Sequence, residues 1–163
     1  MLMRFLVLGL TLVSVAAVAQ DGGRPIEGVR SPGCLVNGAK AEFHAGRFKN
    51  ADGREAVRGE SKFEIAAGND HPPVLIECRV SELRIDGTKA KFGGNAVLTT
   101  IDANRKRIHV KGMANVTVND LHKPDGGDKT KDAYAIQFDD KAGHNFQFGG
   151  NVDRGDLVVK AKG

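Results

Sequence analysis

The chain has 163 residues, and its 24 Lys and Arg against 20 Asp and Glu give a formal net charge of +4 at pH 7. The length is that of one domain, and the mild positive excess does not predict nucleic-acid binding, which requires basic residues gathered on one face beside aromatic platforms. The densest basic run, Arg105-Lys106-Arg107, follows Asp102 in an expected turn, where a solvated hairpin tip is favoured over a contact with an anionic surface. We therefore expect no nucleic-acid partner.

Residues 1–19 have the three parts of a cleavable signal peptide. A start charged by Arg4 is followed by an almost wholly apolar run over residues 5–18, and Ala17-Val18-Ala19 puts small residues at the two positions that signal peptidase recognises. The run is shorter than the roughly 20 residues that span a bilayer, so a membrane anchor is the weaker alternative. Cleavage before Gln20 would remove one positive charge and deliver a periplasmic or secreted bacterial protein without a membrane span.

Residues 20–32 are polar and contain several Gly and Pro, which predicts a flexible lead-in. From residue 33 to residue 163, apolar and small side chains recur at every second position, which is the period of a β-strand. We expect one all-β domain here, with no substantial helix after the signal peptide. The expected strands lie near residues 39–48, 55–66, 74–85 (with a one-residue bulge at Ser81-Glu82), 90–98, 108–118, 134–138, 146–152 and 157–159.

Short turns separate these segments, among them Asp86-Gly87, residues 102–104 and residues 139–143. About eight strands joined in this way predict a single antiparallel meander that forms a barrel or a sandwich. Apolar residues alternate with charged ones along most strands, so one side of the sheet is buried and the other is solvated. The buried face is rich in Ala and Gly, and the chain holds eight Phe, one Tyr and no Trp, which favours a filled interior over a large ligand cavity.

Two cysteines, Cys34 and Cys78, follow the signal peptide. Exported proteins occupy compartments where disulfides persist, and an even number of cysteines suits one bridge. Closing a loop of this size would stabilise the fold by roughly 3–4 kcal/mol in the chain-entropy model. We predict a disulfide between Cys34 and Cys78, and two unpaired buried thiols are the alternative.

The polar loop over residues 119–128 carries the strongest candidate for a metal site. Asp120, Asp125 and Asp128 offer carboxylates beside two glycines, and exported proteins meet calcium. Their spacing departs from that of the known calcium loops, and Asp, Asn, Gly and Pro are common in any surface loop, so calcium is a weak prediction. The five histidines do not show the spacing of zinc ligands.

The sequence lacks the patterns of a hydrolytic active site. Gly-x-Ser-x-Gly, Ser-x-x-Lys and His-Glu-x-x-His are all absent, and serine after the leader is limited to Ser31, Ser61 and Ser81. Neither cysteine lies beside a histidine in a recognisable pattern. We therefore predict a protein that is not an enzyme and that needs no cofactor.

Three stretches, residues 38–43, 58–63 and 80–94, resemble the β domain called post-COAP, which is found in secreted and surface proteins of bacteria. The resemblance continues through residues 116–120, 132–136 and 149–152, and so spans about residues 38–160. Its motifs are turn glycines and alternating apolar residues. The resemblance implies export and an all-β module, often appended to other secreted domains, and it brings no catalytic residues. In this sequence we expect the module to stand alone after its signal, which departs from the appended pattern.

These features together predict a non-enzymatic extracytoplasmic β module. It would act by binding an unknown cell-surface or extracellular partner, or by assembly at the surface. A small β-barrel that carries a hydrophobic ligand is the alternative, and an unrecognised hydrolase is the weakest interpretation.

Overall fold

The computed structural model describes residues 23–121 and 131–163, which contain strands and no helix. The all-β fold class predicted from the two-residue period is therefore confirmed. The strands are β1 (Arg24–Val36), β2 (Ala39–Lys49), β3 (Glu55–Ile65), β4 (Val74–Val80), β5 (Glu82–Asp86), β6 (Lys89–Ile101), β7 (Arg107–Asn119), β8 (Ala133–Asp139), β9 (Asn145–Arg154) and β10 (Val158–Lys160).

The ten strands form one antiparallel sheet that closes into a ring. Its order is β10-β1-β2-β3-β4-β6-β7-β8-β9, and β5 pairs with β6 beside the end of β4. Two pairings between β1 and β9, Leu35 with Arg154 and Val36 with Val152, complete the ring. Most strands pair with the next strand in the chain, as a meander requires.

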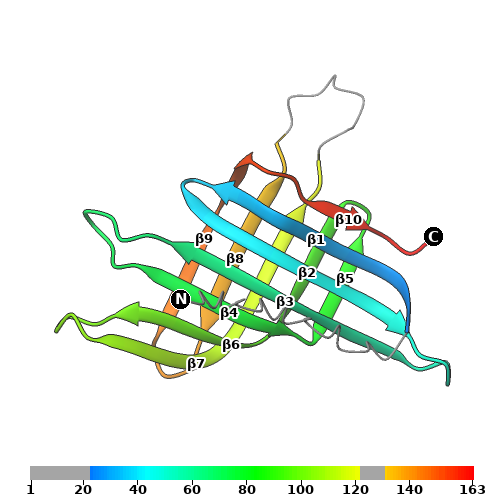
Figure 1. The fold of residues 1–163 in the computed structure, drawn as a ribbon, viewed down its shortest axis with the longest axis horizontal. Coiled ribbons are helices and arrows are strands. Elements are labelled where there is room, and N and C mark those ends of the chain that lie inside the picture. The colour runs from blue at the N-terminus through cyan, green and yellow to red at the C-terminus, as the bar shows by residue number, and fades with distance from the viewer. Residues whose placement is uncertain (1–22, 122–130) are drawn as a thin grey trace, which may run out of the picture.

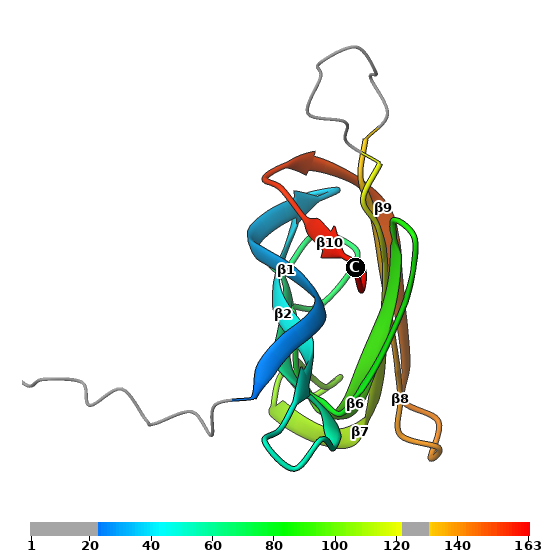
Figure 2. The same cartoon turned by 90° about the vertical axis from the view of Figure 1, so that its right-hand side faces the viewer.

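The ring is flattened into two layers. Figure 1 shows β1 to β4 crossing β5, β8 and β9 at a steep angle, and Figure 2 shows the two layers from the side, with β1 and β2 opposite β6, β8 and β9. This is the orthogonal arrangement of sheet packing, in which long strands pass from one layer to the other at the corners. The structure thus has features of both a barrel and a sandwich.

Glycines allow the sheet to turn its corners. A Cβ atom at Gly94 of β6 would collide with the carbonyl oxygen of Arg79, and one at Gly112 of β7 would collide with the carbonyl oxygen of Asp139. Only glycine permits the backbones to come so close. Both long strands can therefore leave one layer and join the other without a break.

Aromatic rings fill the centre between the layers. The ring of Tyr134 stacks with Phe43 and Phe63 at centroid distances of 6.0 and 6.2 Å. Phe63 also contacts Phe146 and Phe148, at 5.6 and 5.0 Å. Small side chains complete the core around them, as the composition predicted, among them the buried Ala39, Ala41, Ala45, Ala90, Ala96 and Ala114.

The flexible lead-in predicted for residues 20–32 is corrected by the structure, because β1 already begins at Arg24. The Pro and Gly residues that suggested a lead-in coincide with irregularities of the strand: the register with β2 shifts between Pro25 and Glu27 and again between Ser31 and Cys34. Bulges and strand edges tolerate such residues. Val29, in the middle of this stretch, is buried in the core.

The predicted interruption at Ser81-Glu82 is present. β4 ends at Val80 and β5 begins at Glu82, while the backbone N–H of Ser81 donates to the carbonyl oxygen of Gly93. The two strands pair with different parts of β6, so the interruption divides what the sequence suggested was one bulged strand. The turn at residues 102–104 is also confirmed, with Asp102 and Lys106 joined by a backbone hydrogen bond of 2.9 Å.

Candidate functional site

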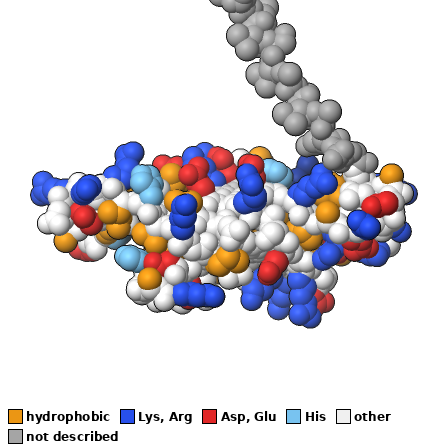
Figure 3. Space-filling view, turned by 90° about the horizontal axis from the view of Figure 1, so that it is seen from below, with side chains coloured by type: hydrophobic (Ala, Val, Ile, Leu, Met, Phe, Trp, Pro, Cys, Tyr) orange, Lys and Arg blue, Asp and Glu red, His pale blue; other side chains and the backbone are white. Residues whose placement is uncertain are grey.

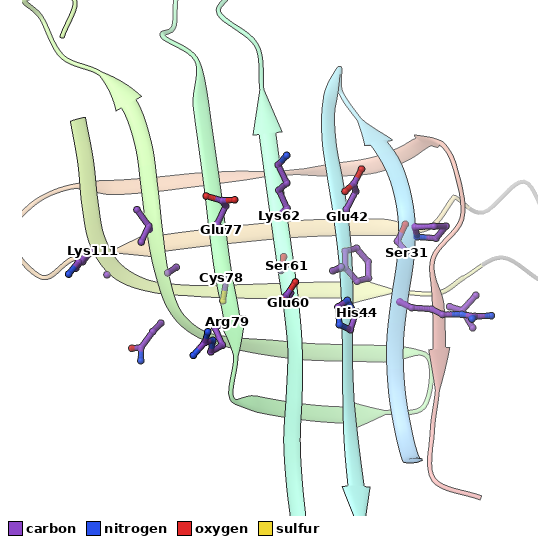
Figure 4. A pocket seen from close by; sticks show the side chains of 18 of the residues that line it. Ser31, Glu42, His44, Glu60, Ser61, Lys62, Glu77, Cys78, Arg79 and Lys111 are labelled. Carbon is purple, nitrogen blue, oxygen red and sulfur yellow. The ribbon is translucent and has the colours of Figure 1, made fainter. Parts of the chain in front are cut away.

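A groove of about 1240 Å³ crosses the outer face of the layer that contains β1 to β4. Its lining also includes residues of β6, β7 and β10, and Figure 4 views it from outside, with the strands of the second layer crossing behind. Pockets for small ligands hold about 300–1,000 Å³ and enclose most of the ligand. This groove is larger and open to solvent, so it suits a segment of a polymer better than a small molecule.

Two rows of exposed side chains form the walls of the groove. Strand register places Glu42, Lys62 and Glu77 side by side across β2, β3 and β4. The second row runs through His44, Glu60 and Arg79 on the same strands, and Figure 4 shows Glu60 between the other two. Acidic and basic side chains thus alternate across the sheet, an order that stabilises neighbouring strands.

The floor between these rows is backbone, because the intervening residues face the interior. Ser31, Phe43, Ser61 and Cys78 are register neighbours on β1 to β4, and all four side chains are buried. The hydroxyl and thiol groups nearest the groove therefore point into the core. The groups that face the groove offer charge and hydrogen bonds rather than a nucleophile.

The charges of the groove are balanced. Its lining includes the carboxylates of Glu42, Glu60, Glu77 and Asp156 and the cations of Arg30, Lys62, Arg79 and Lys111. At one end, Lys40 forms an ion pair with Glu42, and this hydrogen-bonded ammonium lowers the pKa of the Glu42 carboxyl. Figure 3 shows the same mixture of signs on the face seen from below.

A second hollow of about 450 Å³ adjoins the groove. The two share His44, Glu60, Arg79 and Asn95, so they form one polar surface across β2, β3, β4 and β6. Sequence reasoning missed this surface, because it depends on which strands pair and in which register. The alternation of charge on the solvated faces of the strands was the available signal, and aligning the predicted hairpins would have brought Glu42 beside Lys62.

Polar groups also meet inside the ring. Tyr134 and Ser61 carry buried hydroxyl oxygens that have no hydrogen-bond partner among the described residues. Burial raises the pKa of the Tyr134 phenol far above its usual value, the nearby Cys34 and Cys78 thiols add to the rise, and the Ser61 hydroxyl opposes it. Ser61 thus lies close to the phenol but outside hydrogen-bonding geometry. The buried rings of Phe43 and Phe63 stack on Tyr134 in this cluster.

The predicted disulfide is wrong: Cys34 and Cys78 are both free and buried. Two strands, β2 and β3, lie between β1 and β4, so the cysteines are three strand spacings apart, or roughly 14 Å along the sheet. A disulfide needs Cα atoms within about 7 Å. Burial raises the pKa of the Cys78 thiol to about 11 and also raises that of Cys34, so both thiols are poor nucleophiles.

Of the three weak calcium candidates, the structure describes Asp120 alone, and Asp125 and Asp128 lie outside the described residues. One carboxylate oxygen of Asp120 accepts a hydrogen bond of 3.0 Å from the backbone N–H of Val159. Asp120 therefore has a structural role in holding β10 against the sheet. The calcium prediction stays untested.

The described histidines are scattered. The ring of His109 contacts the hydroxyl of Thr99, and that of His144 contacts Asp140 in the turn before β9. Among residues 23–121 and 131–163, no three His, Cys, Asp or Glu side chains come together in a way that could hold a metal ion. Over the same residues, no helix has the length and apolar character to cross a membrane.

Comparisons with known proteins identify no match for this chain. The chain matches no protein-family model, and searches of curated proteins and of solved structures find no significant match. The site must therefore be interpreted from its own residues.

Proposed function

We propose that this protein is an exported, non-enzymatic β module that binds a polymeric partner through the charged groove on β1 to β4. The observation that carries the proposal is the pair of alternating charge rows across an open sheet surface. The signal-like residues 1–19 support export to the periplasm or the medium. The resemblance of residues 38–160 to the post-COAP domain agrees with a surface role.

Side-chain direction favours binding over catalysis. Ser61 and Cys78 lie under the groove, but their side chains face the core. The groove itself offers carboxylates, ammonium and guanidinium groups of both signs. Such a surface is complementary to a partner that carries both charges, as a polypeptide segment does.

The filled interior of the ring weighs against a carrier of hydrophobic ligands. The centre of the ring is occupied by the stack of Phe43, Tyr134 and Phe63, where a carrier would keep an apolar cavity. Native mass spectrometry of protein recovered from exporting cells separates the two ideas, because a carried ligand adds mass. The same spectrum tests export, since the processed chain should begin at Gln20.

A pair of matched variants tests the groove. Lys62→Glu with Arg79→Glu reverses two charges of the walls, whereas Arg54→Glu with Lys106→Glu makes the same change of net charge at exposed turns away from it. We expect wild type and the turn variant to sediment with washed envelopes of exporting cells, and the groove variant to stay in solution. Equal binding of all three proteins would exclude the groove, and no binding by wild type would count against a surface partner.

A further inference from the structure

One strand of the ring has a long unpaired edge. β9 pairs with β8 from Asn145 to Asn151, but on its other side β1 contacts it only at Val152 and Arg154. Within residues 23–121 and 131–163, no strand pairs with residues 145–149 on the side away from β8. Figure 1 shows β9 at the margin of its layer.

The hydrogen bonds of β9 show which backbone groups face this open side. The N–H of Val152 donates to the carbonyl oxygen of Asp132 on the β8 side, and bonding alternates along a strand. Gly150, Phe148 and Phe146 therefore bond to β8, while Gly149, Gln147 and Asn145 turn their groups outward. Consistent with this, the carbonyl oxygen of Gly149 accepts a bond of 3.3 Å from the side chain of Asn37 on the opposite side.

This edge differs in charge from the unpaired edges of β5 and β7. β5 carries Glu82, Arg84 and Asp86 along its outer edge, and the unpaired start of β7 carries Arg107 and Lys111. Proteins protect open edges with such charges or with proline. The β9 segment Asn145-Phe146-Gln147-Phe148-Gly149-Gly150-Asn151 has neither.

Two half-buried aromatic rings lie beside the open edge. Phe146 and Phe148 contact Phe63 on their inner side, but both remain partly exposed. They are two residues apart, so they lie on the same face of β9. An added strand with apolar side chains at alternate positions would cover them while its backbone paired with β9.

We propose that the free edge of β9 binds an extended, uncharged polypeptide segment by strand addition. The partner's backbone would pair with Asn145 and Gln147 and accept from the N–H of Gly149, whose carbonyl oxygen already accepts from Asn37. Its alternate apolar side chains would cover Phe146 and Phe148. Charge favours a neutral segment, because no side chain of the edge could pair with a buried ion. Figure 1 shows the β3–β4 connection of the other layer projecting past β9.

The proposal concerns a different surface from the groove, so the two can fail separately. The probe is a capped peptide with the β8 sequence Ala-Tyr-Ala-Ile-Gln-Phe, which already complements β9 across its other edge. A peptide of the same composition, Tyr-Phe-Ala-Ala-Ile-Gln, is the control, because no two of its Tyr, Phe and Ile side chains are two residues apart on one face of a strand. Residue-resolved amide exchange by NMR on the full mature protein reads the result.

We expect the probe to slow exchange at Asn145, Gln147 and Gly149, whereas the β8-bonded amides of Phe146 and Phe148 are protected without it. Gln147→Pro removes an outward N–H that no strand uses, a change that edge strands tolerate, and should weaken probe binding about tenfold. Gln147→Ala keeps the N–H and should bind like wild type.

Three results would overturn the proposal. The first is no protection at about 1 mM probe, and the second is equal binding of both peptides or of the Gln147→Pro variant. The third is protection of Gln147 that rises with protein concentration without any peptide, which would identify a second copy as the partner. If Gln147→Pro does not fold, the exchange pattern and the control peptide still decide the matter.

Discussion

Tyr134 carries a hydroxyl group into the centre of the ring, where neither it nor the Ser61 hydroxyl has a hydrogen-bond partner among the described residues. A buried polar group without a partner loses its bonds to water on folding and gains nothing in return. The aromatic ring of Tyr134, in contrast, stacks between Phe43 and Phe63. The ring and its hydroxyl therefore have opposite effects on stability.

Replacing Tyr134 by Phe should consequently leave stability unchanged or raise it by up to about 1 kcal/mol. Tyr134→Ala is the control, because it removes the ring as well and should cost about 3–5 kcal/mol. Urea unfolding followed by circular dichroism measures both, since these variants lose the one tyrosine of a chain without tryptophan. A large loss in Tyr134→Phe would mean that the hydroxyl is bonded after all.

The two free cysteines should be inaccessible in the folded protein. Cys34 is 1% exposed and Cys78 is 4% exposed, so a thiol reagent should modify neither until the chain is unfolded, and then both. A reducing agent should leave the melting temperature unchanged, since there is no disulfide to reduce. A lower melting temperature under reducing conditions would restore the predicted disulfide.

Alkaline pH should destabilise the fold through Cys78. Burial raises the pKa of its thiol from 9.0 to about 11, so the folded state holds the proton more tightly than the unfolded state. The stabilisation is complete below pH 9 and is lost as pH rises towards 11, by at most about 3 kcal/mol. Free energies of unfolding measured across this window should fall less steeply in Cys78→Ala, whereas parallel curves would contradict the prediction.

At the scale of strands, Arg47 joins three elements. Its Nε donates to Glu27 of β1 at 2.8 Å, and its Nη2 donates to the carbonyl oxygen of Leu83 of β5 at 2.7 Å. The side chain of Arg47 is 29% exposed and that of Glu27 is 13% exposed. Screening by water is therefore incomplete, and loss of the arginine leaves a half-buried carboxylate without this partner.

Arg47→Ala should destabilise the protein by about 2 kcal/mol. The matched control is Arg54→Ala in the β2–β3 turn, where the side chain is 85% exposed and pairs with Asp52 at 3.5 Å; its effect should stay within about 0.5 kcal/mol. Chemical denaturation of both variants provides the comparison. Equal effects would show that Arg47 does not join the strands energetically.

Sequence reasoning recovered the strands whose two faces differ and missed the one that mixes Pro, Gly and polar residues. β3 was found because Phe63 and Ser61 alternate with charged neighbours, and β7 for a similar reason. β1 was missed because its bulges break the period, although the Asn37-Gly38 turn that follows it, with φ values of 47° and 82°, is a typical hairpin signal. The alternation of apolar and polar residues along a strand indicates which side chains are buried only where the strand register is regular.

The groove and the cysteine pair depend on positions across the sheet, which periodicity does not report. Glu42, Lys62 and Glu77 come together only after two hairpins have been aligned. The same alignment separates Cys34 from Cys78 by two strands. Counting cysteines predicted a bond that the lateral order of the strands forbids.

At the scale of the whole molecule, closure of the ring makes its parts interdependent. The core is one continuous cluster to which nearly every strand contributes, and β1 pairs with strands from both ends of the chain. Unfolding should therefore be a single cooperative transition, with coincident curves from far-ultraviolet circular dichroism and from tyrosine fluorescence. Two separated transitions would indicate that the layers are independent.

The pairing of β1 with β9 and β10 also has a consequence for a chain that emerges from the ribosome or a translocation channel with its N-terminus first. β1 is released early, but two of its neighbours, β9 and β10, are released after all the other described strands. Until then β1 can form only its hairpin with β2, and the backbone groups on its other edge have no partner strand. A nascent chain that stops before Val152 would lack these pairings, so the ring closes only once residues 152–160 have been released.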